Sequence, residues 1–287
     1  MTMPDFSGAA DALVAPHPLA TRRAGAGVVA YREAGTGPAL VLLHGIGNQS
    51  GSWTLQLTAF GARFRTIAWD APGYGGSDRL PAESPTAADY AGALAALLDA
   101  LGVGRAVVVG SSFGALVAGA FAASRPERTA GLLLLNPAGG YGLADPKERE
   151  ERLTTRLARL ARLGPERMAM EPSPGMLSAN ASDEARAIAA WSTARIRPDG
   201  YAQAARTLAN GRLVEDAARY PGPVLVVAGS ADTITPPAGC ERIARAFPHA
   251  TYRLLDGPGH LSYLDAPATM NALVADFAAS CMQGATA

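Results

Sequence analysis

A serine between two glycines is a candidate nucleophile. The run GSSFG at residues 110–114 matches the pattern G-x-S-x-G, with Ser112 at its centre. The preceding run, RAVVV, is typical of a buried strand, and the residues that follow predict a helix. At such a strand–turn–helix junction the serine hydroxyl projects above the sheet. Ser112 is therefore predicted to attack an electrophilic carbon such as an acyl carbon.

A serine hydroxyl is a weak nucleophile near neutral pH and needs a general base. His260 is the best candidate among four histidines, because it follows the last predicted strand in the turn GPGH. Asp232 directly follows the strand-like run PVLVVAGSA and is the preferred acid to orient that base. The chain order Ser112, Asp232, His260 fits this type of junction.

Two other aspartates compete with Asp232. Asp256 lies four residues before His260, where it is expected to hold the turn at the end of a strand. Asp70 begins the run DAPGYG, which predicts a structural turn. Whether Asp256 takes the place of Asp232 stays open at this level.

Backbone N–H groups beside Ser112 are expected to stabilise the oxyanion of a tetrahedral intermediate. One is the N–H of Phe113, at the start of the predicted helix. The second is the N–H of Ile46 in the loop HGIG at 44–47, whose glycines allow the backbone to turn inward. Loss of one such donor typically lowers the rate by ~10²–10³.

A further group of residues is expected to contact the substrate, because its members lie in the motif loops or in a helical insert. These residues are His44, Gly45, Met168, Met176, Trp191 and Leu261. A role in shaping the loop is the alternative for His44, and core packing explains the methionines and Trp191 equally well. Arg195 and Arg197 could anchor a substrate carboxylate, although a solvated charged face is the default interpretation.

The elements that position these residues are short apolar runs that alternate with helical patterns. The predicted strands are 28–31, 39–43, 65–69, 105–109, 130–135, 223–228 and 251–255. Continuous runs of leucine and β-branched residues indicate strands buried on both faces, as in a parallel sheet. The alternation with helices predicts an α/β fold with a mostly parallel, doubly wound sheet.

Residues 140–219 contain no strand-like run. Helices are predicted there at Pro146–Leu163, Ser182–Ile196 and Pro198–Leu208. We expect this insert to form a helical cap over the carboxyl ends of the strands, where open α/β sheets bind ligands. Residues 21–139 and 220–287 then form the core, and residues 1–20 a loosely ordered segment.

Composition limits the partners. Lys and Arg number 25, as do Asp and Glu, so the formal net charge is zero and general attraction to nucleic acid or anionic membranes is not expected. Cys240 and Cys281 belong to no metal-binding cluster and fit a reducing compartment. Without a leader-like segment or a membrane-spanning run, we expect a cytoplasmic protein acting on a small molecule. Whether it forms a homodimer is left open.

Five motifs together resemble those of the α/β-hydrolase superfamily. They are HGIG at 44–47, WDAPGYGGSD at 69–78, GSSFG at 110–114, GSADTITPP at 229–237 and GPGH at 257–260. Within it, the chain resembles bacterial carboxylesterases, enol-lactonases and meta-cleavage-product hydrolases. The resemblance implies a Ser-Asp-His triad, an acyl-enzyme or gem-diol route, and no cofactor.

Three functional hypotheses follow. The first is hydrolysis of a small carboxylic ester or lactone through an acyl-enzyme. The second is hydrolysis of a carbon–carbon bond in a dienol product of meta ring cleavage by the same residues. Ser111 before the nucleophile and Leu261 after His260 depart from the meta-cleavage pattern and favour the first. The third is a ligand-binding protein that retains the fold without turnover.

Overall fold

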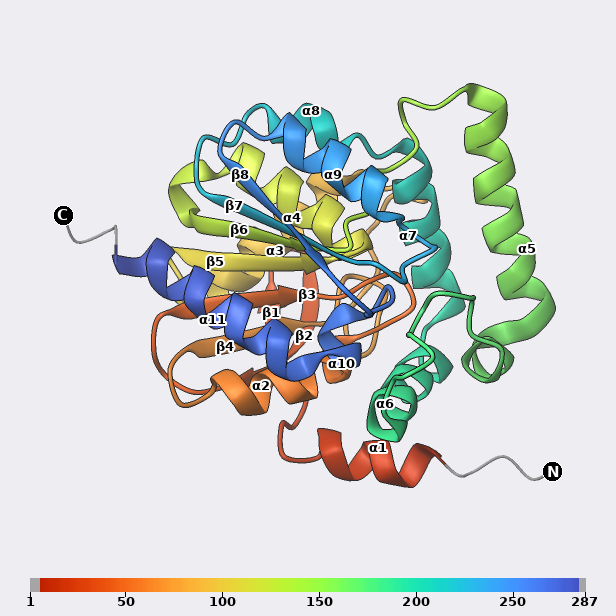
Figure 1. The fold of residues 1–287 in the computed structure, drawn as a ribbon, viewed down its shortest axis with the longest axis horizontal. Coiled ribbons are helices and arrows are strands. Elements are labelled where there is room, and N and C mark those ends of the chain that lie inside the picture. Colours follow the sequence, from red (N-terminus) through yellow and green to blue (C-terminus); the bar gives the residue numbers. More distant parts are fainter. Residues whose placement is uncertain (1–5, 284–287) are drawn as a thin grey trace.

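An eight-stranded sheet forms the centre of the protein in a computed structural model that describes residues 6–283 (Figure 1). Its strand order is β1-β2-β4-β3-β5-β6-β7-β8. The strands are β1 (Ala20–Ala24), β2 (Gly27–Ala34), β3 (Ala39–Leu43), β4 (Arg65–Trp69), β5 (Ala106–Ser111), β6 (Thr129–Leu135), β7 (Val224–Gly229) and β8 (Ala250–Leu255). The β1–β2 and β2–β4 pairs are antiparallel, and all pairs from β4 to β8 are parallel. The predicted mostly parallel sheet is therefore confirmed.

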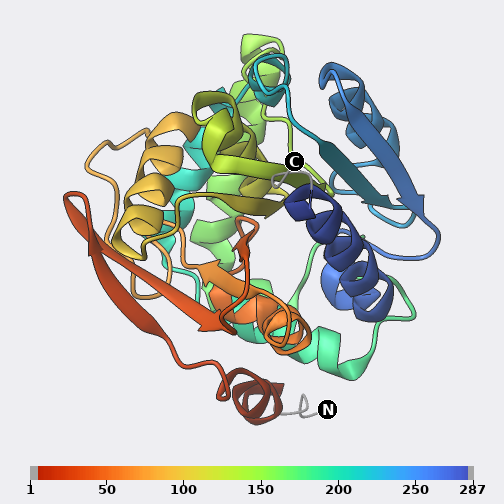
Figure 2. The same ribbon diagram turned by 90° about the vertical axis from the view of Figure 1, so that its left-hand side faces the viewer.

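Helices cover both faces of the sheet (Figure 2). They include α2 (Thr54–Phe60), α3 (Ala87–Ala100), α4 (Phe113–Ser124), α9 (Pro237–Ala246), α10 (Ser262–Asp265) and α11 (Pro267–Gln283). Alternate strand residues enter separate cores: Val41 packs in the cluster that contains residues of α3 and α4, and Leu42 in the cluster that contains residues of α2 and α11. Because both faces are buried, the strands read as continuous apolar runs.

Each of the seven predicted apolar runs coincides with a strand. The first strand, β1, was not predicted, because its sequence ATRRA is mostly polar and exposed. It pairs antiparallel with β2 and is the edge strand of the sheet formed by residues 6–283. An edge strand of this kind lacks the apolar run that marks the buried strands.

Between β6 and β7 the described chain is helical, as the sequence predicts. The helices are α5 (Pro146–Met170), α6 (Asp183–Ala194), α7 (Pro198–Asn210) and α8 (Leu213–Ala217). The predicted end of the first helix, Leu163, falls at a kink: Gly164 has φ 64°, and a second helical piece follows from Pro165. Helix α5 packs against α6 and α7 at the side of the molecule (Figure 1). No helix within residues 6–283 is long and apolar enough to cross a membrane.

The prediction of a loosely ordered segment over residues 1–20 is wrong for its described part, residues 6–20. Helix α1 (Phe6–Val14) packs against α6, where Val14 is buried with Trp191. The Trp191 Nε1–H donates a hydrogen bond to Asp11. The apolar side of α1 is covered by an element about 180 residues later, which local patterns cannot reveal. Residues 1–5 lie outside the described part of the chain.

Candidate active site

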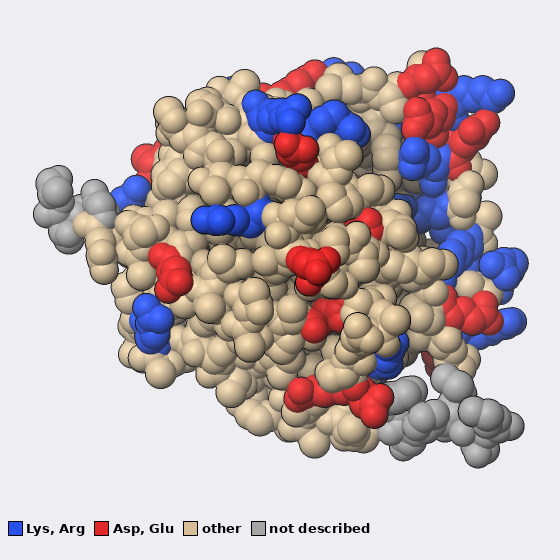
Figure 3. Space-filling model, viewed as in Figure 1, with Lys and Arg blue, Asp and Glu red and all other residues tan. Residues whose placement is uncertain are grey.

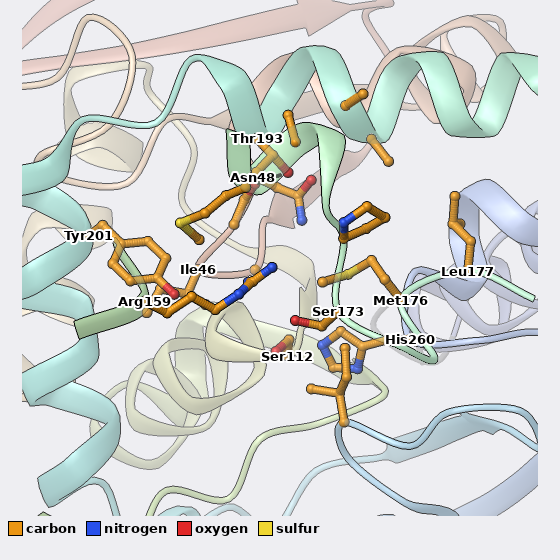
Figure 4. Close-up of a pocket in the computed structure, with 18 of the residues that line it drawn as sticks. Ile46, Asn48, Ser112, Arg159, Ser173, Met176, Leu177, Thr193, Tyr201 and His260 are labelled. Carbon is orange, nitrogen blue, oxygen red and sulfur yellow. Dashed lines mark hydrogen bonds between the residues drawn. The ribbon is translucent and has the colours of Figure 1, made fainter. Parts of the chain in front are cut away.

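Ser112 stands at a sharp turn between β5 and α4. Its backbone angles, φ 53° and ψ −114°, are costly for a residue with a Cβ. The flanking glycines permit this turn: a Cβ on Gly110 would collide with the carbonyl of Gly114, and one on Gly114 with the carbonyl of Leu43. The Ser112 N–H donates to Leu135 O at 3.0 Å. Close backbone packing therefore holds the strained conformation, and the hydroxyl faces a cavity (Figure 4).

The structure brings His260 and Asp232 together in the loops that follow β8 and β7. The His260 Nδ1–H donates to Asp232 Oδ2 at 2.9 Å, and both residues are buried. His260 and Ser112 line the same cavity, and both side chains point into it (Figure 4). The three residues predicted for nucleophile, base and acid thus converge at the carboxyl ends of neighbouring parallel strands.

The Asp232 carboxylate accepts several further hydrogen bonds. Its Oδ1 accepts the N–H groups of Ile234 and Thr235 at 2.7 and 2.9 Å. Its Oδ2 is 2.8 Å from Asn136 Nδ2 and 2.7 Å from Thr235 Oγ1. Burial alone raises the pKa of Asp232, but hydrogen bonds from His260 and Thr235 outweigh it and hold the pKa below its ordinary value. The carboxylate therefore stays charged and can stabilise an imidazolium.

Sequence reasoning missed Asn136, Thr235 and Ser262, which position this pair. Asn136 follows β6 with φ 45°, and its side chain accepts from Ser262 Oγ at 2.6 Å. The backbone carbonyl of Asn136 lies 3.0 Å from Thr235 Oγ1. One signal was present: asparagine tolerates positive φ and here ends the strand between those that lead to Ser112 and Asp232.

The rival aspartates have other partners. Asp256 is exposed and lies 3.1 Å from Ser230 Oγ. Asp70 is buried and accepts the N–H of Ser50 at 2.7 Å and that of Gly76 at 3.4 Å. Among the described residues, Asp232 is thus the carboxylate that contacts His260, and Asp70 holds a turn as predicted.

Of the two residues predicted to supply oxyanion donors, Phe113 follows Ser112 directly and Ile46 lines the same cavity as Ser112. Phe113 begins α4, so its N–H has no acceptor within the helix. The loop that carries Ile46 approaches Ser112 so closely that a Cβ on Gly45 would lie 3.3 Å from Ser112 Cβ. Tyr74 Oη donates to the Ile46 carbonyl at 2.9 Å and holds that loop. The arrangement is compatible with the predicted role, which stays a prediction.

A cavity of about 870 Å³ opens in front of Ser112 and His260, a size typical of small-molecule sites. Of the residues predicted to contact substrate, four line it: Gly45, Met168, Met176 and Trp191. Within residues 6–283 there is no group of three or more His, Cys, Asp or Glu side chains that could hold a metal ion.

Two substrate-contact predictions are corrected, since neither His44 nor Leu261 is among the residues that line this cavity. His44 is fully buried; its Nδ1–H donates to Gly45 O at 2.8 Å, and its Nε2 accepts the N–H of Ala71 at 3.0 Å. Burial lowers the pKa of His44, so it is a neutral side chain that shapes the loop. Leu261 packs in the core on the α11 side of the sheet.

The arginines considered for carboxylate binding both have acidic partners. Arg195 lies 3.3 Å from Asp11 and over the ring of Trp191. Arg197 lies 3.3 Å from Asp199 and donates to Ser77 O at 2.9 Å. Arg195 borders the cavity and Arg197 does not, which supports the default interpretation for Arg197.

The sequence matches a known family. A family model described as alpha/beta hydrolase fold matches residues 38–267. An uncharacterised protein of Mycobacterium tuberculosis is 30% identical over 272 residues, covering 86% of this chain and 77% of that protein. A 2-hydroxy-6-oxononadienedioate/2-hydroxy-6-oxononatrienedioate hydrolase of Burkholderia vietnamiensis is 44% identical over 119 residues, 40% of this chain and 41% of that protein.

Two solved structures are also similar. A thermophilic esterase from Thermogutta terrifontis, solved with malate bound, has a TM-score of 0.82 and 27% identity, and the match covers 92% of this chain and 99% of that chain. The enol-lactonase from Burkholderia xenovorans LB400 has a TM-score of 0.73 and 24% identity, over 90% of this chain and 99% of that chain. The second likeness shows the fold alone.

The packing at the turn predicts that Gly114→Ala destabilises the protein. The added methyl group would collide with the Leu43 carbonyl, so we expect the free energy of unfolding to fall by at least about 3 kcal/mol. Gly92→Ala in α3 is the control, because its Cβ would meet no atom within 4 Å and a gain of up to about 1 kcal/mol is expected. Urea denaturation measures the free energy of unfolding of both variants. Equal effects of the two substitutions would contradict the close packing inferred at Gly114.

The hydrogen bonds to Asp232 predict a pH-dependent effect of Thr235→Val. Removing a donor to a buried carboxylate should cost about 1.5–3 kcal/mol at pH 7. A lowered carboxyl pKa stabilises the fold above the unfolded-state pKa of about 3.9, and this stabilisation is lost as pH falls through the folded-state pKa. The difference between wild type and variant should therefore shrink below about pH 4.

Denaturation at several pH values tests this expectation. Thr233→Val is the matched control, because the Thr233 hydroxyl donates to the carbonyl of Pro174 rather than to a carboxylate. Its effect should not change with pH. A Thr235→Val effect that is equal at pH 7 and at pH 3 would show that the hydroxyl does not act on the charge of Asp232.

Proposed function

The chain belongs to the α/β-hydrolase fold family, and on that basis we propose that it is a serine hydrolase of small carboxylic esters or lactones. The observation that carries the proposal is the buried Asp232–His260 pair, whose histidine lines the same cavity as a serine on a strained turn. The esterase from Thermogutta terrifontis, which is similar over 92% of this chain, supports ester hydrolysis. The likeness to the enol-lactonase supports the fold, and lactone hydrolysis is proposed on that fold.

In the proposed reaction, Ser112 Oγ attacks the acyl carbon while His260 Nε2 accepts the hydroxyl proton. Asp232 stabilises the imidazolium through Nδ1–H. The N–H groups of Phe113 and Ile46 stabilise the oxyanion. His260 then protonates the departing alkoxide, leaving an acyl group on Ser112. Water, deprotonated by His260, attacks this ester and releases the carboxylic acid.

We further propose that residues 140–219 act as a cap on a core formed by residues 21–139 and 220–287. The cap supplies Met168, Met176 and Trp191 to the lining of the cavity. It also contacts the loop that carries the base, since the His260 N–H donates to Gly175 O at 2.8 Å. Cap side chains would therefore select the substrate, while the core supplies the reacting groups.

The nucleophile is tested with a fluorophosphonate probe and mass spectrometry. Wild type should be labelled on Ser112, and Ser112→Ala should lose both labelling and at least about 10³-fold in kcat for p-nitrophenyl acetate. Ser111→Ala is the matched control, because the Ser111 hydroxyl is buried without a hydrogen-bond partner in the described structure. Labelling that persists in Ser112→Ala would refute the proposal. Steady multiple turnover by the wild type would exclude a protein that only binds ligand.

A second candidate is hydrolysis of a carbon–carbon bond in a dienol acid. The observation in its favour is the 44% identity over 119 residues to the Burkholderia vietnamiensis hydrolase. The same three residues would add water across the bond beside a ketone, giving a carboxylic acid and an enol that becomes a ketone. We expect kcat/KM for p-nitrophenyl esters to exceed that for 2-hydroxy-6-oxo-6-phenylhexa-2,4-dienoate, followed by its absorbance. The reverse order would favour the second candidate.

A further inference from the structure

Helix α5 directs two arginines toward the cavity that contains Ser112. Arg156 and Arg159 lie three residues apart, so their side chains share one side of the helix. Both line the cavity together with Ser112 and His260. Figure 4 shows the Arg159 guanidinium pointing into this space, between Tyr201 and Ser173. The two positive charges therefore border the space in which a substrate would lie.

Neither arginine has an acidic partner among residues 6–283. The ion pairs of the described chain include other arginines of α5: Arg152 lies 2.7 Å from Glu148, and Arg167 lies 3.1 Å from Glu171. Figure 3 shows positive and negative side chains intermixed over the side of the molecule where α5 lies. The same helix thus pairs charges elsewhere along its length and leaves Arg156 and Arg159 without a carboxylate.

Neutral oxygens orient both guanidinium groups. Burial lowers the pKa of Arg156, but interactions with the hydroxyl groups of Tyr201 and Tyr141 outweigh it, so the pKa is raised and the side chain remains a cation. Arg159 donates to the backbone carbonyl of Glu171. Hydroxyl and carbonyl oxygens accept hydrogen bonds without cancelling the charge, so the side chains are held in place while their charge is uncompensated.

The charge around the cavity differs from that of the whole chain, which is formally neutral. The charged residues that line it are Arg156, Arg159, Arg186, Arg195 and Glu166. Of these, Arg195 has a carboxylate partner within the described residues, Asp11. A cavity lined with an excess of positive charge attracts anions and raises their local concentration. Guanidinium groups in particular match a carboxylate through two parallel hydrogen bonds.

We propose that Arg156 and Arg159 form a carboxylate subsite, and that the substrate is an ester or lactone that carries a second, non-reacting carboxylate. The inference rests on the proposed function, since it names the substrate class of the same site. The carboxylate binds at α5 and holds the acyl carbon near Ser112. A half-ester of a dicarboxylic acid has both groups. A carboxylate ligand would supply the acidic partner that neither half-buried arginine has among residues 6–283.

The first test compares kcat/KM for mono-p-nitrophenyl glutarate and p-nitrophenyl hexanoate, which are similar in length and differ in charge. Wild type should prefer the anionic ester. Arg156→Gln and Arg159→Gln should each lower the anionic-to-neutral ratio at least about tenfold, mainly through KM. Arg162→Gln is the matched control: Arg162 is exposed on the same helix and does not line the cavity. An unchanged ratio in the first two variants, or an equal loss in Arg162→Gln, would overturn the proposal.

The second test does not depend on catalysis. Calorimetric titration of Ser112→Ala with glutarate at pH 7 should show binding, and the added pair Arg156→Gln and Arg159→Gln should raise Kd at least about tenfold. Circular dichroism checks that the variants are folded. Absence of glutarate binding by folded Ser112→Ala would overturn the subsite. Persistence of hydrolysis in Ser112→Ala would instead overturn the proposed function and leave the binding result to decide on the subsite.

Discussion

The buried carboxylate of Asp232 is the interaction on which the candidate site depends. A carboxylate out of water is costly unless its oxygens are hydrogen-bonded. Here the donors come from the ends of three strands: Asn136 after β6, Thr235 after β7 and His260 after β8. Hydrogen bonding to the Asp232 carboxylate therefore brings together the loops that follow three strands. The orientation of His260 toward the cavity follows from that requirement.

The strained turn at Ser112 imposes a second constraint of a different kind. Its conformation persists because the first turn of α4 lies against the end of β3, with no room for a Cβ at Gly114. Close backbone packing and backbone hydrogen bonds fix the position of the serine, whereas side-chain hydrogen bonds fix the position of the histidine. The two meet because β5, β6, β7 and β8 are adjacent and parallel, so their carboxyl ends share an edge.

The helical segment 140–219 is joined to this edge through backbone as well as side chains. Gly175 accepts from the His260 N–H, and a Cβ at Gly259 would come within 3.0 Å of the backbone of Leu177. Trp191 packs so closely over Gly51 that a Cβ there would meet its ring. The segment therefore packs closely against the rest of the protein and forms one side of the cavity. The arginines of this segment that line the cavity give that side an excess of positive charge, although the chain as a whole is formally neutral.

Much of the fold could be predicted because its signals are local. Runs such as ALVLL become β3 within the predicted bounds, since a strand buried on both faces must be apolar throughout. Strand β1 and helix α1 escaped prediction because one is a polar edge and the other is stabilised by contact with the distant α6. A sequence pattern that spans five to fifteen residues carries no information about contacts between segments that lie far apart in the chain.

The sequence by itself predicted Ser112, Asp232 and His260 in that order, with Asp256 open as an alternative to Asp232, because each follows a strand and one lies in a strand–turn–helix motif. Only the tertiary structure showed that Asp232 and not Asp256 contacts His260, and that Asn136 and Thr235 hydrogen-bond to Asp232. The structure also places His44 and Leu261 in the protein interior and not in the lining of the cavity, and it shows that Arg156 and Arg159 line the cavity. The physical reason is that the sequence assigns a side chain to a helix, strand or loop, whereas the packing of that element against the rest of the protein determines which residues the side chain contacts.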